Sequence, residues 1–300
     1  MDVEKAKAHV PDSEYFEYNS RDAIIYALGI GAHAKDDIHY IYESHENFTV
    51  FPTFVVAPGL AAAGLMSWPG IEFDLTRILH GEQYIEVYEP LPADAKLRSE
   101  SRVVDILDKG SGALFLSNVT TYDDRSGKKL SMQQISTFQV GSGKFGGAKT
   151  SPHEKKVEDT PKRDPDAVME EKTSVDQAAL YRMGSGDLNP LHVDPNFAKM
   201  SGFKEPILHG LCSLGFATRH VIKAWADNDA TRFKAMKVRF SSPVLPGQTL
   251  VTEMWNSGDN KIHFQTKVKE TGKVVISNAW VQLSQASSKP TVDEKYASKM

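Results

Sequence analysis

The chain has 300 residues, of which 40% are hydrophobic and 25% charged, and its formal net charge is −4. These values describe an ordinary globular chain that can bury a sizeable core, and they argue against nucleic acid as a partner. A single cysteine excludes an intrachain disulfide and a zinc site built on several cysteines. No segment approaches the ~18 consecutive apolar residues of a membrane span, so we expect none.

Two stretches of the first half resemble stretches of the second half, in the same order. Residues 21–31 align with residues 176–186, with a tyrosine and a glycine at matching positions, and residues 90–97 resemble residues 244–250. Two ordered matches indicate an internal duplication. Each half is expected to form a helix followed by antiparallel strands, which is an α+β arrangement.

The expected strands follow from apolar residues at every second position. In the first half they occupy about residues 83–140, with glycine-containing breaks at residues 109–112 and 125–127. In the second half, residues 236–240 and 279–283 alternate in the same way. This period predicts strands with one buried face.

A polar stretch separates the two halves. Residues 141–167 are rich in glycine, lysine, acidic residues and proline, which predicts a linker. The expected organisation is therefore an N-terminal repeat at 1–140, the linker, a C-terminal repeat at 168–286 and a flexible tail at 287–300.

The tail ends in Ser298, Lys299 and Met300. This tripeptide is close to the Ser-Lys-Leu address that a peroxisomal import receptor reads, with methionine as the apolar final residue. We therefore expect that receptor as a partner and the peroxisome as the location.

The most informative segment runs from Gly184 to Asp194, Gly-Ser-Gly-Asp-Leu-Asn-Pro-Leu-His-Val-Asp. Pro190 forbids a continuous helix, so the chain must turn and can bring Asp187 and His192 together. A carboxylate and an imidazole that converge can activate a water molecule. Asn189 could hold either group through a side-chain hydrogen bond. From spacing alone, a turn shaped by Asp187 and Asn189 with His192 as a polar core residue is equally acceptable.

A long helix is expected next, from apolar residues at helical spacing: Leu211, Leu214, Val221, Ile222 and Trp225. Pro206-Ile-Leu-His-Gly210 precedes it. A glycine at a helix start exposes free backbone N–H groups, which can bind a developing oxyanion such as that of a thioester. A plain helix start with His209 packed locally is the alternative.

The residues from Tyr181 to His192, followed by Asp194 to Ala198, resemble the signature of the MaoC-like, (R)-specific enoyl-CoA hydratases, or hydratase 2 enzymes. Residues 206–212 and 244–250 are also typical of them, and the resemblance extends from about Tyr18 to Leu283. It is especially close to the hydratase domain of peroxisomal multifunctional enzymes of type 2. The resemblance implies a double hot-dog fold, in which each of two repeats wraps an antiparallel sheet around a helix.

The resemblance also implies site residues. Asp187 and His192 would be the catalytic dyad, Asn189 would support them, and the Gly210 N–H would bind the thioester oxygen. Contacts with the CoA substrate would come from His80, Gly81, Lys109, Leu188, Pro190, Leu191 and Phe240. Glu43 matches an acidic residue tied to activity in relatives, but a structural role in pairing with a basic group is as well supported.

The first repeat would lack a dyad, because Ala32 and Asp37 stand opposite Asp187 and His192. The small residues of 57–64 would leave room there for a long acyl tail.

The implied reaction is reversible hydration of a trans-2-enoyl-CoA to a (3R)-3-hydroxyacyl-CoA in peroxisomal β-oxidation. It would need no metal and no redox cofactor, and the protein would be a homodimer. A calcium loop starting at Asp187 is not expected, because its twelfth position is Ala198. The alternatives are a hot-dog acyl-CoA thioesterase and a non-catalytic acyl-CoA-binding protein.

Overall fold

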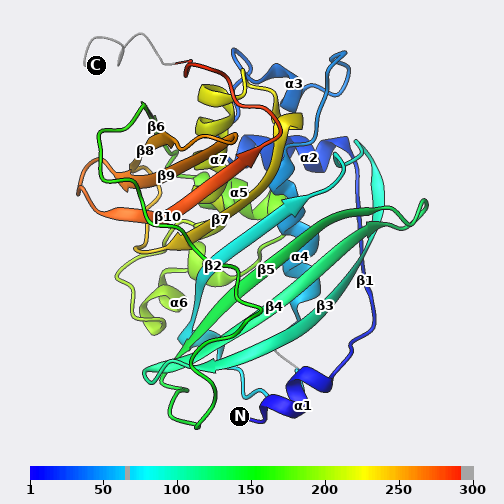
Figure 1. Ribbon diagram of the computed structural model, residues 1–300, viewed down its shortest axis with the longest axis vertical. Helices are drawn as coiled ribbons and strands as arrows, with labels where there is room; N and C mark the ends of the chain where they lie inside the picture. Colours follow the sequence, from blue (N-terminus) through cyan, green and yellow to red (C-terminus); the bar gives the residue numbers. More distant parts are fainter. Residues whose placement is uncertain (65–67, 292–300) are drawn as a thin grey trace.

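The computed structural model describes residues 1–64 and 68–291. Ten antiparallel strands form one sheet in the order β1-β3-β4-β5-β2-β7-β10-β9-β8-β6 (Figure 1). The strands are β1 (Glu14–Tyr18), β2 (Ile78–Val87), β3 (Ala95–Asp108), β4 (Gly112–Asp123), β5 (Lys129–Val140), β6 (Ala167–Lys172), β7 (Phe233–Phe240), β8 (Thr249–Asn256), β9 (Lys261–Val268) and β10 (Val274–Leu283).

Seven α-helices and four short 3-10 helices in the described ranges accompany the sheet. They are α1 (Val3–Ala8), α2 (Ser20–Gly29), α3 (Ile38–Ile41), η1 (Pro52–Val55), α4 (Val56–Ala63), η3 (Leu75–Arg77), α5 (Gln177–Ser185), η4 (Pro190–His192), α6 (Pro195–Met200), α7 (Gly210–Trp225) and η5 (Ala230–Arg232). None of these helices is long and apolar enough to cross a bilayer.

The strand order repeats itself about the seam between β2 and β7. From that seam outward, the first half runs β2-β5-β4-β3-β1 and the second half runs β7-β10-β9-β8-β6, so each strand has a counterpart five places later in the chain. The duplication expected from two short sequence matches is therefore present in the whole topology.

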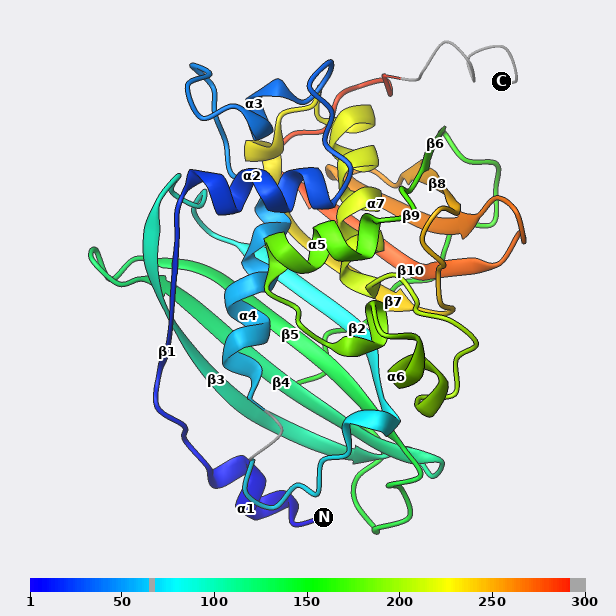
Figure 2. The same cartoon turned by 180° about the vertical axis from the view of Figure 1, so that it is seen from behind.

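Each half of the sheet curves around one helix. Figure 2 shows the strands lying behind α4 and α7. The α7 helix spans 16 residues and is buried almost throughout, whereas α4 has only eight and contacts β1, β3 and β4. Two helices, each wrapped by five strands, form the expected α+β double hot-dog fold.

The aligned stretches of the two halves become α2 and α5, which pack against each other. A Cβ atom on Gly184 would lie 2.5 Å from the Tyr26 Cα, and one on Gly29 would lie 3.0 Å from the Tyr181 Cα. These glycines let the backbones approach closely, and the two tyrosine rings lie 5.7 Å apart. The contact is reciprocal, as two copies of one motif require.

The linker is held on the sheet rather than free. Residues 141–166 contain no helix or strand, but the Lys155 N–H donates to the Gln134 side chain on β5. Farther along, Glu158 pairs with Lys261 and His263 on β9. The linker therefore spans strands of both repeats.

Candidate active site

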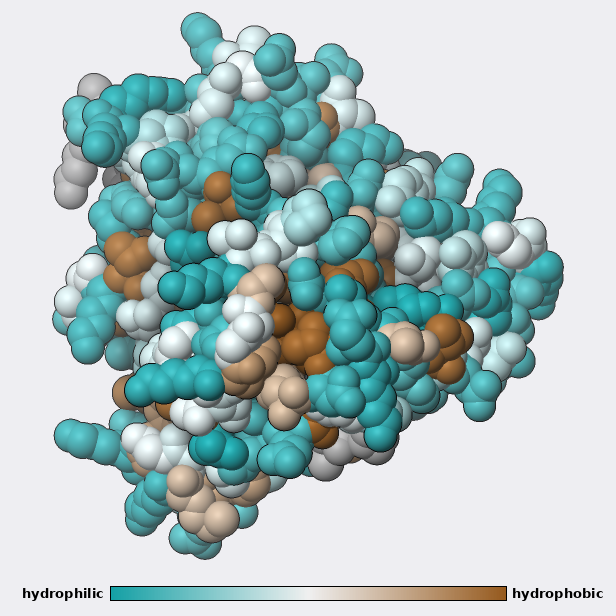
Figure 3. All heavy atoms as spheres, turned by 60° about the horizontal axis from the view of Figure 1, so that its bottom comes forward, coloured by the Kyte–Doolittle hydropathy of each residue, from teal (hydrophilic) through white to brown (hydrophobic). Residues whose placement is uncertain are grey.

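A cavity of about 1210 Å³ opens among α4, β2, β5, the loop after α5 and the start of α7. Figure 3 shows apolar side chains gathered in a hollow of one face, framed by hydrophilic ones. The apolar part of the cavity receives side chains from the first repeat, including Phe16, Ala57, Leu60, Ala61, Ala63, Phe73, Leu75 and Ile78. The polar part comes mainly from the second repeat, so both halves build one cavity.

The loop after α5 carries Asp187 and His192 into this cavity. Gly186 ends α5 in the left-handed conformation, with φ 70°, which glycine adopts without strain. Pro190 then starts the 3-10 helix η4, in which its missing N–H costs nothing. Asp187, His192 and His209 each offer one ligand atom, and these atoms lie within 4.8 Å of one another. The Asp187 and His192 side chains therefore converge, as the bend in the loop allows.

A hydrogen bond fixes the tautomer of His192. Its Nδ1 lies 2.8 Å from the Ile207 carbonyl oxygen, which can only accept, so the proton is on Nδ1 and Nε2 carries a lone pair. Burial lowers the pKa of His192 below its usual 6.5, although the Ile207 contact and Asp187 act in the opposite direction. His192 is therefore a neutral base at neutral pH.

Two further histidines near the dyad are also neutral. Burial and the neighbouring His192 lower the pKa of His209 to about 2. Burial lowers the pKa of His80 to about 4, although its bond to Gln83 and the charge of Asp187 raise it. Neither His80 nor His209 therefore adds a positive charge beside Asp187.

The start of α7 forms the opposite side of the polar region. Gly210 is the first residue of α7, where backbone N–H groups have no partner within the helix. A Cβ atom on Gly210 would lie 3.2 Å from the Phe240 ring, so glycine lets this ring lie against the helix start. The Phe240 ring also meets His80 edge to face at 5.1 Å. The register of β2 shifts between His80 and Glu82, which places an irregularity at Gly81 beside the cavity.

Asn189 supports the carboxylate through its backbone. Its N–H donates to Asp187 Oδ1 at 3.2 Å, while its side-chain oxygen accepts from the Leu191 N–H. The structure shows no side-chain hydrogen bond from Asn189 to Asp187 or His192 among the described residues, and the side-chain oxygen caps η4. Leu188, Pro190 and Leu191 line the cavity, as expected of substrate contacts.

Two expected residues do not line the cavity. Lys109 follows the end of β3, where its Nζ donates to the Lys149 carbonyl. Glu43 is exposed in the loop after α3 and has no ion pair among the described residues. No described cation pairs with Glu43, and its part as a supporting acid stays a prediction.

Asp187, His192 and His209 lie close enough together that a metal ion bound between them has to be considered. The rings of His192 and His209 are stacked, with centroids 3.6 Å apart and planes at 28°. Ring lone pairs lie in the ring planes, so stacked imidazoles direct them side by side rather than to one point. Zinc requires lone pairs that converge at about 2.0–2.1 Å. The arrangement fits a proton-transfer pair better than a metal centre.

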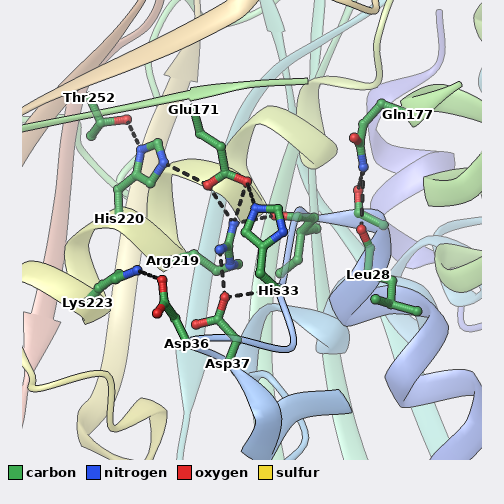
Figure 4. Close-up of polar contacts among 12 residues, drawn as sticks. Leu28, His33, Asp36, Asp37, Glu171, Gln177, Arg219, His220, Lys223 and Thr252 are labelled. Carbon is green, nitrogen blue, oxygen red and sulfur yellow. Dashed lines mark hydrogen bonds and ion pairs between the residues drawn. The ribbon is translucent and has the colours of Figure 1, made fainter. Parts of the chain in front are cut away.

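The corresponding loop of the first repeat has become structural. Asp37 is buried and pairs with the Arg219 guanidinium at 2.8 Å. Figure 4 shows Arg219 between Asp37 and Glu171, with His33 and His220 also on Glu171. An ionic cluster therefore occupies the place where a second dyad would stand.

The sequence did not indicate that His209 contacts Asp187 and His192. It also did not indicate the hydrogen-bonded glutamines beside His80. His80 Nε2 bonds to Gln83, whose amide donates to Gln133, and Gln133 donates to the Val55 carbonyl before α4. The histidine directly before the expected helix start was the available signal for His209. The glutamines lie in strands and carry no such signal.

Comparisons with known proteins agree with this geometry. The family described as the MFE-2 hydratase 2 N-terminal domain matches residues 16–141, and the MaoC-like domain family matches residues 156–279. The mouse peroxisomal multifunctional enzyme type 2 (Mus musculus) is 51% identical over 95% of this chain, which spans 39% of the mouse protein. The chain thus covers less than half the length of that relative.

Two other relatives match over nearly their whole length. The peroxisomal enoyl-CoA hydratase 2 of Arabidopsis thaliana is 41% identical and covers 89% of this chain, which spans 91% of the plant protein. A crystal structure of a MaoC-like dehydratase from Phytophthora capsici superposes with a TM-score of 0.85 at 35% identity, covering 95% of this chain and 98% of that one. With both halves matched in order and the dyad loop in place, the chain belongs to the hydratase 2 family of MaoC-like hydro-lyases.

Proposed function

We propose that this chain adds water reversibly across the double bond of a trans-2-enoyl-CoA and forms a (3R)-3-hydroxyacyl-CoA. The observation that carries the proposal is the convergence of Asp187 and His192 beside the start of α7, in a cavity with an apolar extension. Hydration of an acyl thioester requires a carboxylate and an imidazole that accept protons, an oxyanion site and an apolar channel for the acyl chain.

The proposed reaction starts with a water molecule between Asp187 and His192. The carboxylate and the His192 Nε2 lone pair accept hydrogen bonds from it, and its oxygen attacks C3 of the substrate. One proton of the water passes to the dyad, and the dyad returns one proton to C2. Negative charge that builds up on the thioester oxygen is stabilised by the Gly210 N–H and the helix dipole.

The apolar part of the cavity is proposed to hold the acyl tail. Ala57, Ala61 and Ala63 present small side chains to it from α4. These residues leave space beside the sheet that larger side chains would fill, and burial of an alkyl chain against such a surface is favourable.

The setting of the reaction is also proposed. Hydration involves no net oxidation or reduction, and the dyad and the Gly210 N–H supply the acid–base and oxyanion chemistry, so no metal or redox cofactor is proposed. Relatives with peroxisomal names support a peroxisomal location, and import would use the final tripeptide Ser298, Lys299 and Met300, which lies outside the described residues. A homodimer is proposed because the resemblance implies one.

Replacement of each dyad residue tests the proposal. We expect Asp187→Asn and His192→Gln each to lower the hydration rate of trans-2-decenoyl-CoA by roughly 100-fold or more, because each removes a proton acceptor. Both changes are nearly isosteric, so the melting temperature should stay close to that of the wild type. Near-normal turnover in either variant would refute the role of that residue, and release of free CoA would indicate a thioesterase.

A further inference from the structure

His209 is a buried polar side chain whose presence packing alone does not explain. It is 1% exposed, and its Nδ1 is buried without a hydrogen-bond partner among the described residues. A buried nitrogen without a partner is unfavourable, and an apolar ring would fill the same space without that cost. The contacts of the other ring atoms therefore have to account for the histidine.

Those contacts reach both members of the dyad. The ring stacks on His192 with centroids 3.6 Å apart, and Nε2 lies 3.4 Å from the Asp187 carbonyl oxygen. A carbonyl only accepts, so Nε2–H is the donor. The next residue in the chain is Gly210, whose N–H is the proposed oxyanion donor. The His209 side chain thus connects His192, Asp187 and the start of α7.

We propose that His209 is a positioning residue that holds Asp187 and His192 in register with the Gly210 N–H. The inference rests on the proposed function and adds a residue to it. His209 contacts both members of the dyad and would act by placing them.

A series of aromatic contacts links His209 to both repeats. Tyr181 lies 4.9 Å from the His209 ring, Tyr26 lies 5.7 Å from Tyr181, and Phe54 lies 5.3 Å from Tyr26. These separations are typical of aromatic pairs in contact. His192 stacks on this series of rings, so a displacement of its ring toward His209 is opposed by buried rings from both halves of the molecule.

The neutral state of His209 suits a residue that positions His192. Burial keeps its pKa at about 2, so the ring stays neutral through the range in which enzymes work. When His192 accepts a proton it becomes a cation, and a charged neighbour at 3.6 Å would oppose this step. A neutral ring positions His192 without repelling its protonated form.

Two variants separate the stack from the hydrogen bond. His209→Phe keeps a flat ring and loses the donor to Asp187, while His209→Gln keeps a donor and loses the stack. We expect each to lower kcat for trans-2-decenoyl-CoA by roughly 10- to 100-fold while KM changes by less than about 3-fold, because misplacement affects the transition state more than substrate binding. Their thermal unfolding should remain close to that of the wild type.

A second readout does not depend on turnover. Histidine ¹⁵N NMR of the full chain reports the tautomer and titration of His192. In the wild type we expect the Nδ1–H form, because Nδ1 donates to Ile207. In His209→Gln the Nδ1–H form should persist, because the Ile207 carbonyl still accepts from Nδ1. The pKa of His192 should move up towards 6.5, because the opened stack admits water.

The matched control is His220→Gln on the same helix. His220 is 2% exposed and bonds to Thr252 and Glu171 in the ionic cluster, away from the dyad. We expect wild-type kcat and an unchanged His192 titration there. The inference is overturned if the His209 variants keep the wild-type His192 titration, or if His220→Gln reproduces their losses. If the wild-type chain hydrates no enoyl-CoA, the proposed function alone fails, and the His192 titration still decides the inference.

Discussion

The proposed chemistry depends on which nitrogen of His192 carries a proton. The Ile207 carbonyl holds the proton on Nδ1, and burial keeps the ring neutral. The same loop holds Asp187 through the Asn189 backbone N–H. Two backbone groups therefore prepare the dyad before substrate arrives, which is the kind of preorganisation that lowers a barrier.

The pH dependence of the reaction follows from this state. The pKa of His192 lies below 6.5, and the neutral form is the active one, so protonation removes activity only as the pH falls below that lowered value. We expect kcat/KM for trans-2-decenoyl-CoA to decline on acidification with a midpoint below pH 6.5. A pH–rate profile checks this, and an acidic limb centred at or above 6.5 would contradict a buried neutral base.

At the scale of elements, α4 distinguishes the two repeats. It has half as many residues as α7, and alanines face the cavity where α7 is packed with larger side chains. The helix of the non-catalytic repeat has thus become a wall of the binding cavity.

Enlarging one of these alanines should change the preference for chain length. Ala61 is exposed and lines the cavity, so Ala61→Phe fills the channel without overpacking the core. We expect kcat/KM for a C16 enoyl-CoA to fall by roughly 10-fold or more, with crotonyl-CoA nearly unaffected. Ala8→Phe on α1, at an exposed position outside the cavity lining, is the control. Equal effects on short and long substrates would place the acyl tail elsewhere.

Most elements were predictable because their patterns are local. Apolar spacing indicated α7, and apolar residues at every second position indicated the strands that became β7 and β10. The strands β1 and β6 were not predicted, because each is short and lies at an edge of the sheet, where only one neighbour stabilises it. Ala167 was assigned to the linker but begins β6.

The site was predictable to the extent that it depends on one loop. The bend at Pro190 and the spacing of Asp187 and His192 indicated their convergence. The position of Glu43 on the loop after α3 was not predictable, because the path of that loop is set by packing rather than by a sequence pattern. The contact of His209 with His192 was not predicted, because it joins two segments that the sequence does not show to be neighbours.

At the scale of the molecule, an ionic cluster joins the repeats. Arg219 on α7 binds Asp37 from the first repeat and Glu171 on β6. Burial alone would raise the pKa of Asp37, but the charge of Arg219 holds it below its usual 3.8. The charged form of this carboxyl group therefore favours the folded state.

Removal of that charge should destabilise the whole chain. We expect Asp37→Asn to lower the free energy of unfolding by about 3 kcal/mol, because Arg219 stays buried with one partner fewer. Asp36→Asn, which breaks the more exposed pair with Lys223, should cost no more than about 1 kcal/mol. Urea unfolding near neutral pH compares the two variants, and equal stabilities would show that the buried pair contributes nothing beyond a surface pair.

Burial would also raise the pKa of Glu171, but His220, Arg219 and His33 together lower it to about 2. Its folded-state pKa is depressed from 4.5, so its stabilisation is present above about pH 4.5 and is lost as the pH falls towards 2. This loss lies below the range in which the dyad is expected to work.

The most direct test of the account is the configuration of the product. Purified protein would be incubated with trans-2-decenoyl-CoA, and the 3-hydroxyacyl-CoA formed would be resolved on a chiral column, with Asp187→Asn as the blank. The account predicts the (3R) enantiomer alone from the wild type and almost no product from the variant. A (3S) product, or free CoA without any hydroxyacyl product, would contradict it.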